Sequence, residues 1–422
     1  MQDLSRITAT AAVKLIRDGH IEPMEVMEAC LDRIDQREDE RHAFAHFAPE
    51  AASRAASRPR PGPLAGLPIG VKDVLDTADM PSQYGSPIWQ GWQPKADCAA
   101  VAAARAAGAV VVGKTVTTEF ATRTPGPTTN PANPGHTPGG SSSGSAAGVG
   151  DFFFPLAFGT QTAGSIIRPA AYCGVVGYKP TFGLISRVGM KIMSDSLDTV
   201  GVMARSVADC ALFAAAVSGR NLGNPDSKPD TAPRIGVCKT LSWDQASPET
   251  QALLGRIADA LSRAGAKVTD FDLPGHFDEL ETAHPIVMNN ESARALGWEM
   301  NNHRSQLSET LRDRLDFGLA QTEATLDAAC AAFQRTQAAF PGAMEGLDIL
   351  LTPSAPGEAP AGLESTGDPS FNYIWTTLHG PCITLPAGTG PNGLPLGIQI
   401  CGRPNEDRAT LAWAAWVAGA IG

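Results

Sequence analysis

Apolar residues in the first 35 positions recur every three to four residues, which is the period of an amphipathic helix. In the first such stretch, Val13 and Leu15–Ile16 fall on one face, and Gly19 follows as a stop signal. In the second, Pro23 opens an apolar stripe that continues to Ile34. The pattern therefore predicts two consecutive helices at the start of the chain.

A proline-rich connector at residues 58–63 (RPRPGP) separates these helices from a segment with strand character. Apolar runs at Leu67–Val74 and Ala109–Val112 predict two strands, and the stretch Ala96–Ala107 between them predicts a helix. A strand, a helix and a strand in this order form a βαβ unit, in which helices cover a sheet. The pattern thus predicts an α/β fold.

Residues 125–150 break this rhythm. They are dense in glycine, serine, proline, asparagine and threonine and contain almost no large apolar residue, so we expect a long loop. Long loops in compact domains are usually functional. The apolar run Phe152–Phe158 predicts a buried strand, and the stretch 223–233, rich in proline and aspartate, predicts a surface loop rather than a domain boundary.

The second half of the chain repeats the α/β pattern and shows no internal repeat, which favours one large domain. Long helices are predicted across about 279–340. The remaining predicted elements are strands at 234–238, 267–273, 349–352, 383–386 and 396–401 and helices at 247–264 and 408–420.

Composition narrows the functional classes. The chain has 422 residues, 43% of them hydrophobic, and a formal net charge of −11. An acidic chain argues against nucleic-acid binding, because that requires a basic surface. No stretch of roughly 18 apolar residues is present and the N-terminus lacks the apolar core of a signal peptide, so we expect neither a membrane span nor secretion. The eight cysteines show neither CxxC pairs nor metal-ligand spacing, which favours reduced thiols in a cytosolic chain and no metal site.

Two motif matches are weak on structural grounds. Residues 108–115 (GAVVVGKT) match the phosphate-binding loop pattern, but three consecutive valines belong inside a strand. Residues 140–144 (GSSSG) match a nucleophile elbow around Ser142, but the sequence NPGHTPG before them cannot form the strand that this motif follows. His379, the base that such a hydrolase would need, lies in an HGP sequence that favours a turn. We therefore expect neither nucleotide binding nor an α/β-hydrolase site.

Three other segments combine residue types that can carry catalysis. Lys72 is predicted to lie in an apolar strand, on the face opposite Val71. It could serve there as a buried base, or it could be a lysine at a strand end or a member of a structural ion pair. The run 139–147 (GGSSSGSAA) predicts a tight, ordered loop rather than a flexible linker. The turn 159–165 (GTQTAGS) presents backbone N–H groups beside the Ser165 hydroxyl, as an oxyanion hole or a simple helix cap would.

Together these segments resemble the amidase signature family. The match consists of GVKD, GGSSSGSAA and GTQTAGSIIRPAA at the family's spacing, with GKTVTTEFA between them, and it extends over essentially the whole chain. The resemblance implies one α/β/α domain over residues 1–422, with a large mixed sheet covered by helices and with residues 1–60 packed on it as an N-terminal helical segment. Stretches such as GWQP and STGDP are most similar to the bacterial malonamidase branch.

The resemblance also implies an amidohydrolase mechanism. Ser165 would be the nucleophile, Ser141, placed after a cis peptide bond, would be the bridging serine, and Lys72 would be the terminal base. A serine hydroxyl needs such a base, and a neutral lysine can act through a second hydroxyl. Water would then hydrolyse an acyl-enzyme, without a metal or organic cofactor. The oxyanion would be held by the backbone N–H groups of Thr162, Ala163, Gly164 and Ser165.

The sequence departs from the common form of the family in two places. Gln161 and Ala163 stand where aspartate and glycine are usual, and a Cβ at position 163 would be strained if the turn needs a positive φ. Arg168 falls three residues after the nucleophile instead of two, as in the malonamidase-like branch. Its guanidinium would hold the free carboxylate of a short, malonamate-type amide, or else pin a neighbouring loop.

Three other functions are weighed against a free amidohydrolase. An amidase-like component of a tRNA-dependent amidotransferase would need a partner protein and usually a longer chain. The intact lysine and serines argue against a non-catalytic binding relative, and the lack of an anchoring helix argues against a membrane-bound lipid amidase. The expected partners are therefore a small amide substrate and, from the resemblance, a second copy of the chain in a homodimer.

Overall fold

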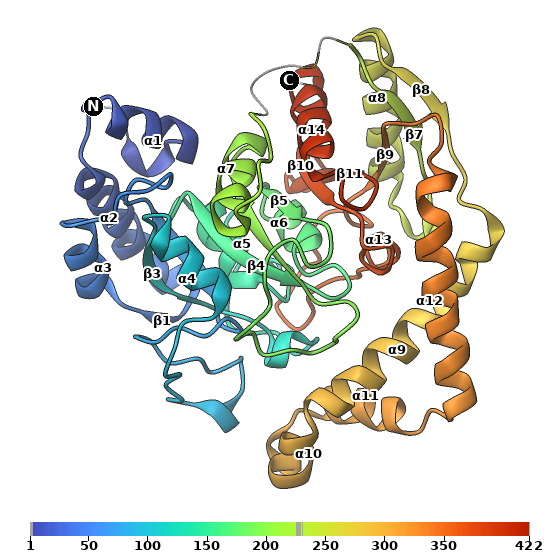
Figure 1. The fold of residues 1–422 in the computed structure, drawn as a ribbon, viewed down its shortest axis with the longest axis horizontal. Helices are drawn as coiled ribbons and strands as arrows, with labels where there is room; N and C mark the ends of the chain where they lie inside the picture. The colour runs from blue at the N-terminus through green and yellow to red at the C-terminus, as the bar shows by residue number, and fades with distance from the viewer. Residues whose placement is uncertain (1–2, 225–228, 230, 422) are drawn as a thin grey trace.

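The computed structural model describes residues 3–224, 229 and 231–421, and its described strands form one mixed sheet (Figure 1). Eleven strands among these residues lie in the order β1-β3-β2-β4-β6-β5-β10-β11-β9-β7-β8. Pairing is parallel between β2 and both its neighbours and between β7 and both its neighbours, and antiparallel elsewhere. The strands are β1 (Phe44–Phe47), β2 (Pro68–Lys72), β3 (Val110–Thr115), β4 (Leu156–Gln161), β5 (Val176–Lys179), β6 (Thr199–Ala204), β7 (Arg234–Val237), β8 (Lys267–Asp270), β9 (Ile349–Pro353), β10 (Cys382–Thr389) and β11 (Pro395–Cys401).

Helices cover both faces of this sheet, as predicted for an α/β/α arrangement. The helices are α1 (Ala9–Arg17), α2 (Pro23–Arg41), α3 (Pro49–Ala56), α4 (Ala99–Ala106), α5 (Ser143–Gly150), α6 (Ile167–Tyr172), α7 (Val207–Ser218), α8 (Pro248–Arg263), α9 (Glu279–Ala295), α10 (Gly297–His303), α11 (Glu309–Leu319), α12 (Glu323–Ala343), α13 (Tyr373–Thr377) and α14 (Asp407–Ile421). Helices α9 to α12 follow one another in a helical arm that reaches beyond the sheet at α10 (Figure 1).

Alternation along the strands divides the core into two layers. Val111 of β3 and Leu351 of β9 pack with side chains of α1, α4, α7, α8 and α14. Val112 packs on the other face with α5 and α6, and Leu350 packs there with α9, α12 and α13. Because neighbouring residues of a strand point to opposite faces, both layers draw on the same strands.

Most predicted elements are confirmed within a few residues. The two N-terminal helices are α1 and α2, and Gly19 adopts the left-handed conformation (φ +71°) that glycine allows after a helix. The GAVVVGKT sequence provides β3, all of whose residues are buried, so it is a core strand rather than a phosphate-binding loop.

The prediction of a loop over residues 125–150 is wrong at its end, because Ser143–Gly150 form α5. Small residues let this helix approach the sheet closely: a Cβ on Gly144 would lie 2.1 Å from the Ala43 carbonyl oxygen, and one on Gly148 would lie 2.3 Å from Phe154 Cζ. Close packing thus outweighs the low helix propensity of glycine. The strand predicted at 152–158 is also displaced, because Phe152 has a φ of +65° in the turn after α5 and the strand begins at Leu156.

Three further expectations concern loops, membranes and thiols. The predicted loop at 223–233 lies partly outside the described residues. In the described part of the chain, no helix combines the length and apolar character that crossing a membrane requires. All eight cysteines are unpaired, and Cys330 alone among them is exposed.

Candidate active site

Three chain segments meet where β2 and β4 end. These strands are parallel neighbours, so their carboxyl ends open at the same edge of the sheet, where α/β proteins commonly bind ligands. Lys72 is the last residue of β2, and Ser165 lies in the turn between β4 and α6. Ser141 lies just before α5, a helix that packs on both strands. The topology therefore gathers the three residues predicted for catalysis at one edge.

Lys72 is fully buried on the sheet face opposite Val71, as alternation predicted. Its Nζ donates hydrogen bonds to Ser141 Oγ and to Thr160 Oγ1, both at 2.7 Å. Burial lowers the pKa of Lys72 to about 7, an effect that the negative charge of Asp198 partly offsets. A lysine with this pKa is neutral often enough near pH 7 to accept a proton.

The alternative of a structural ion pair applies to a different lysine. Lys114 of β3 is also fully buried, and its Nζ lies 2.9 Å from a carboxylate oxygen of Asp73. Lys72 has no carboxylate within ion-pair distance among the described residues. The two buried lysines therefore differ: Lys114 is charge-paired, whereas Lys72 contacts only neutral oxygen atoms.

Four hydroxyls of the serine-rich run are buried, and one of them reaches the lysine. The peptide bond before Ser141 is cis, as the family resemblance implied. Ser142, Ser143 and Ser145 each donate to a backbone carbonyl, at 3.3, 3.2 and 2.7 Å. Ser141 is the serine of this run that contacts Lys72. The other three hold α5 and the preceding turn in place.

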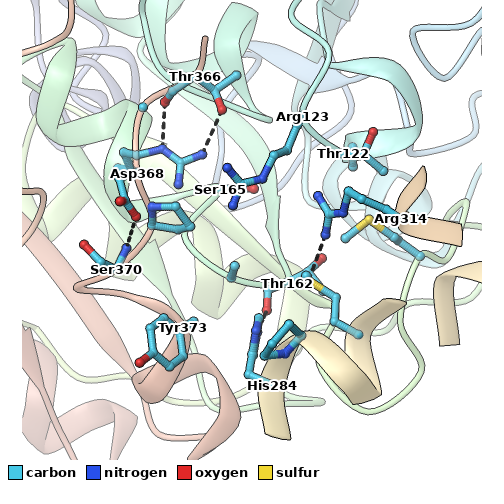
Figure 2. A pocket seen from close by; sticks show the side chains of 18 of the residues that line it. Thr122, Arg123, Thr162, Ser165, His284, Arg314, Thr366, Asp368, Ser370 and Tyr373 are labelled. Atoms are coloured by element: carbon cyan, nitrogen blue, oxygen red, sulfur yellow. Dashed lines mark hydrogen bonds between the residues drawn. The ribbon is translucent and has the colours of Figure 1, made fainter. Parts of the chain in front are cut away.

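Ser165 is half-buried and lines a cavity of about 270 Å³ (Figure 2). Its hydroxyl makes no hydrogen bond to another described residue, Ser141 included. Ser141 and Lys72 are not among the residues that line the cavity. The structure thus brings Lys72 and Ser141 into contact and leaves the Ser165 hydroxyl available to a molecule in the cavity.

The turn that leads to Ser165 contains backbone N–H groups without an acceptor among the described residues, which the predicted oxyanion hole requires. Gln161 accepts hydrogen bonds from the N–H groups of Ile166 and Ile167, at 2.8 and 3.0 Å, through its Oε1. The four preceding N–H groups donate to no other described residue, so they can face a developing negative charge. They belong to Thr162, Ala163, Gly164 and Ser165.

Gln161 and Ala163, the two residues that depart from the common family sequence in this turn, are both accommodated there. Ala163 is not among the described residues with a positive φ, so its Cβ carries no backbone strain. Its carbonyl accepts a hydrogen bond from Thr376 Oγ1 at 2.7 Å. Gln161 donates to the same hydroxyl through Nε2 at 2.9 Å. The glutamine thus orders the turn from both ends of its amide.

Sequence reasoning missed Asp198, a fully buried carboxylate beneath the turn. It accepts hydrogen bonds from Thr162 Oγ1 and from the backbone N–H groups of Met193 and Ser194. On the other side, His284 Nε2 lies 3.2 Å from the Thr162 carbonyl oxygen, and burial lowers the pKa of His284 to about 4. No motif marks either residue, because each reaches the turn only through tertiary packing.

Arg168 pins two loops, as one of the two sequence interpretations expected, and its side chain also lines the cavity. Its Nε donates to the Thr366 carbonyl at 2.8 Å, and its Nη2 donates to the Gly140 carbonyl at 2.7 Å, so it pins two loops. The remaining Nη1 is buried without a partner among the described residues, and the side chain lines the cavity. Burial lowers the pKa of Arg168 to about 10, so the group remains a cation near neutral pH.

The nucleophile-elbow alternative finds no support in the geometry. Ser142 is preceded by a loop instead of a strand, and its hydroxyl donates to a backbone carbonyl. His379 lies in a turn with its ring stacked on Phe182, at 4.2 Å between ring centroids, and its Nε2 contacts the Ser196 carbonyl. Neither residue lines the cavity of Ser165.

Comparison with known proteins agrees with this geometry. The family model described as Amidase matches residues 25–411. The glutamyl-tRNA(Gln) amidotransferase A-subunit of Salinispora arenicola (strain CNS-205) is 33% identical over 487 residues, covering 100% of this chain and 99% of the relative. The chain belongs to the amidase family.

Solved amidase structures share the whole fold. The 6-aminohexanoate cyclic dimer hydrolase, complexed with substrate, superposes with a TM-score of 0.90 at 27% identity, covering 99% of this chain and 98% of that one. The native peptide amidase from Stenotrophomonas maltophilia gives a TM-score of 0.81 at 27% identity, covering 99% and 97%. This amidase is therefore a hydrolase of amide C–N bonds on a single α/β domain, whereas the closer resemblance to malonamidase stays a prediction.

Proposed function

We propose that the protein is an amidohydrolase that converts a small linear amide to a carboxylate and ammonia, with Ser165, Ser141 and Lys72 as its triad. The observation that carries this proposal is the 2.7 Å contact between Lys72 Nζ and Ser141 Oγ, at the same sheet edge as a cavity lined by Ser165. A depressed lysine pKa and a row of free backbone N–H groups at the same sheet edge support it.

The reaction begins with proton transfer away from the nucleophile. Neutral Lys72 accepts the proton of Ser141 while Ser141 accepts the proton of Ser165, and the Ser165 oxygen forms a bond to the amide carbon. The free N–H groups of the turn stabilise the resulting oxyanion. The hydrogen bond from Lys72 to Thr160 Oγ1 fixes the amine, which directs its lone pair toward Ser141.

Collapse of the intermediate completes the first half of the reaction. The C–N bond breaks, and the proton held by Lys72 returns through Ser141 to the leaving nitrogen, which departs as ammonia. Water then attacks the acyl-enzyme on Ser165 by the same relay and releases the carboxylate. Each step uses only water and side chains or backbone groups of this chain, so the proposal requires neither a metal nor an organic cofactor.

We further propose that the substrate is a short amide with a carboxylate near the scissile carbonyl, of the malonamate type. Arg168 supports this specificity, because its Nη1 is unpaired among the described residues and the side chain lines the same cavity as Ser165. A charged donor without a partner in a buried setting favours an anionic acceptor. The cavity volume of about 270 Å³ also suits a small substrate.

The amidotransferase relative favours one other candidate, the amidase-like component of a tRNA-dependent amidotransferase. Against it, the chain has a net charge of −11, whereas RNA binding requires a basic surface. An amidotransferase component would also depend on a partner protein for its reaction. Hydrolysis of free amides by the isolated chain therefore separates the two functions.

The biological setting is part of the same proposal. We take residues 1–422 as one catalytic unit that includes the segment 1–60, whose helices α1 to α3 are accompanied by strand β1 of the sheet, and we propose that it acts as a homodimer in the cytoplasm. Eight unpaired cysteines suit a compartment that keeps thiols reduced. The proposed partners are the amide substrate and a second copy of the chain, with no nucleic acid and no membrane.

Ammonia release from a panel of amides tests the function. The panel contains malonamate, malonamide and neutral fatty amides, and the variants are Ser165→Ala and, as a matched control, Ser57→Ala at an exposed site on the N-terminal segment. Loss of the nucleophile should lower kcat by at least about a thousandfold. Near wild-type rates in Ser165→Ala would overturn the triad, and an isolated wild-type chain inactive on every amide would favour the amidotransferase function.

A further inference from the structure

Charged side chains of both signs line the cavity beside Ser165, and the arginines outnumber the carboxylates. Three arginines line it, and none of them has a carboxylate within ion-pair distance among the described residues. Two acidic residues, Glu281 and Asp368, also line it, and both are exposed. The arginines are Arg123, Arg168 and Arg314.

Arg314 is fixed against the helical arm by neutral groups. It belongs to α11, and its Nε and Nη2 donate to Asn289 Oδ1 of α9 at 3.1 and 2.9 Å. The pKa of Arg314 is lowered to about 10, first by burial and then by the positive charge of Arg123. The two guanidinium groups are therefore close enough to repel each other, and no counterion from the described chain separates them.

Arg123 lies in a loop that hydrogen bonds hold in place, but its own side chain makes no hydrogen bond to another described residue. The side chain is exposed. The preceding Phe120 and Ala121 have left-handed backbones, with φ of 45° and 57°, which non-glycine residues rarely adopt. The Phe120 N–H donates to the Tyr84 carbonyl at 2.8 Å, which holds this turn in place. Such a strained but anchored turn is typical of a ligand-contacting segment.

One anchor ties the loop of Arg123 to the helix of Arg314. The carboxylate of Glu119 accepts hydrogen bonds from the backbone N–H and the hydroxyl of Ser308, the residue that caps α11. The hydroxyl of Thr124 lies 2.8 Å from the same Ser308 hydroxyl. The two arginines are thus mounted on segments far apart in sequence but joined to each other. Figure 2 shows Arg314 on the side of the cavity away from Asp368 and Tyr373, with the side chain of Arg123 between Arg314 and Asp368, near Ser165.

We propose that Arg123 and Arg314 form a second anion subsite, which binds an additional carboxylate of the substrate. The inference rests on the proposed function, because the substrate concerned is the amide that Ser165 attacks. A pair of guanidinium groups without counterions offers several N–H donors to one carboxylate, whose charge also relieves their repulsion. Together with Arg168, the pair selects amides that carry two carboxylates beside the scissile amide, that is, monoamides of tricarboxylic acids.

Three substrates that differ in the number of carboxylates test this specificity. They are the terminal monoamide of propane-1,2,3-tricarboxylic acid with two, succinamate with one and butyramide with none. Arg123→Gln should lower kcat/KM for the first by about ten- to a hundred-fold, the effect of losing a charged hydrogen-bond donor, and should lower it much less for butyramide. Arg123 makes no described hydrogen bond, so this variant does not disturb the fold through a lost contact.

Two further variants complete the set. Arg314→Lys keeps the charge but not the planar fork, so it should show a smaller loss of the same kind. Arg294→Gln on α9 makes the same charge change outside the cavity lining and serves as the matched control. If Arg123→Gln lowered kcat/KM equally for all three substrates, or no more than Arg294→Gln does, the second subsite would be ruled out.

Calorimetry separates failure of the subsite from failure of the proposed function. Propane-1,2,3-tricarboxylate and glutarate are titrated into the wild-type protein and into Arg123→Gln, a measurement that does not depend on hydrolysis. The subsite predicts tighter binding of the tricarboxylate and a loss of about tenfold or more in Arg123→Gln. Equal affinities in the two proteins would overturn it even if amides are hydrolysed, and a selective loss would support it even if they are not.

Discussion

Replacing Lys72 by methionine keeps an unbranched apolar side chain but removes the amine that contacts Ser141 and Thr160. The amine has a pKa of about 7 in the folded protein against an ordinary value of 10.5, because burial penalises the charged form. Each pKa unit corresponds to about 1.4 kcal/mol, so at pH 7 the buried amine destabilises the fold by about 4 kcal/mol. The two hydrogen bonds offset about 1 kcal/mol each. Lys72→Met is therefore expected to be inactive and about 2 kcal/mol more stable at pH 7.

The difference in unfolding free energy between Lys72→Met and the wild type should change with pH, in a direction that the pKa of Lys72 determines. Between pH 7 and 10.5 the unfolded chain holds a proton on Lys72 that the folded chain has lost, so wild-type stability rises with pH by up to about 1.4 kcal/mol per unit. The methionine variant lacks this contribution. Its stability advantage should therefore shrink by about 2 kcal/mol from pH 7 to pH 9. In the wild-type enzyme, kcat/KM should fall about tenfold per pH unit below pH 7, as the base becomes protonated.

Urea unfolding at the two pH values, followed by circular dichroism, measures the stability difference, and ammonia release measures activity. Lys114→Met is the matched control, because Lys114 is equally buried but paired with Asp73. Removing one partner of a buried ion pair costs about 3–5 kcal/mol, so this variant should be less stable than the wild type. A stability difference for Lys72→Met that did not change between the two pH values would refute the argument that burial keeps this lysine neutral.

Three other variants test neighbouring parts of the site. Asp198→Asn removes the charge that raises the pKa of Lys72, so the acidic limb of the kcat/KM profile should move to lower pH; an unmoved limb would contradict this. Gly164→Ala places a Cβ 2.4 Å from Asn372 Oδ1, so the turn that carries the proposed oxyanion hole must shift. This shift should lower kcat about a hundredfold or more, and circular dichroism checks that the variant is folded. Arg168→Ala should raise KM for malonamate about ten- to a hundred-fold more than for a neutral amide of equal size. Equal increases would show that this arginine only pins its two loops.

Much of the candidate site could be predicted from sequence because its residues lie in short motifs whose structure depends on neighbouring residues. Strand alternation alone placed Lys72 on the face opposite Val71, and three valines in a row identified a core strand in place of a phosphate loop. The cis bond at Ser141 came from family resemblance and is present. The two strand predictions succeeded because neighbours in sequence determine them, whereas the cis bond needed the family resemblance.

The remainder depends on contacts between distant segments. The helix Ser143–Gly150 has the composition of a loop and forms only because its glycines fit against Ala43 and Phe154. Gln161 looked like a departure from the family, yet it orders the turn by reaching the start of α6 and Thr376. The pattern of apolar and polar residues along the chain could not reveal these contacts. They depend on partners that are distant in sequence or on the conformation of the Gln161 side chain.

The walls of the cavity come from different segments of the chain, and this affects how substrate specificity can change among related enzymes. Ser165 and residues 162–164, the proposed oxyanion hole, come from the sheet edge, whereas His284, Met288 and Arg314 come from the helical arm. Mutations at arm residues other than His284, which contacts the Thr162 carbonyl oxygen, can therefore reshape substrate choice without removing a contact to the proposed catalytic residues. Exchanging the α10–α11 segment between relatives would replace the wall that carries Arg314 and keep His284 and the sheet edge, which offers an engineering route to new amide specificities.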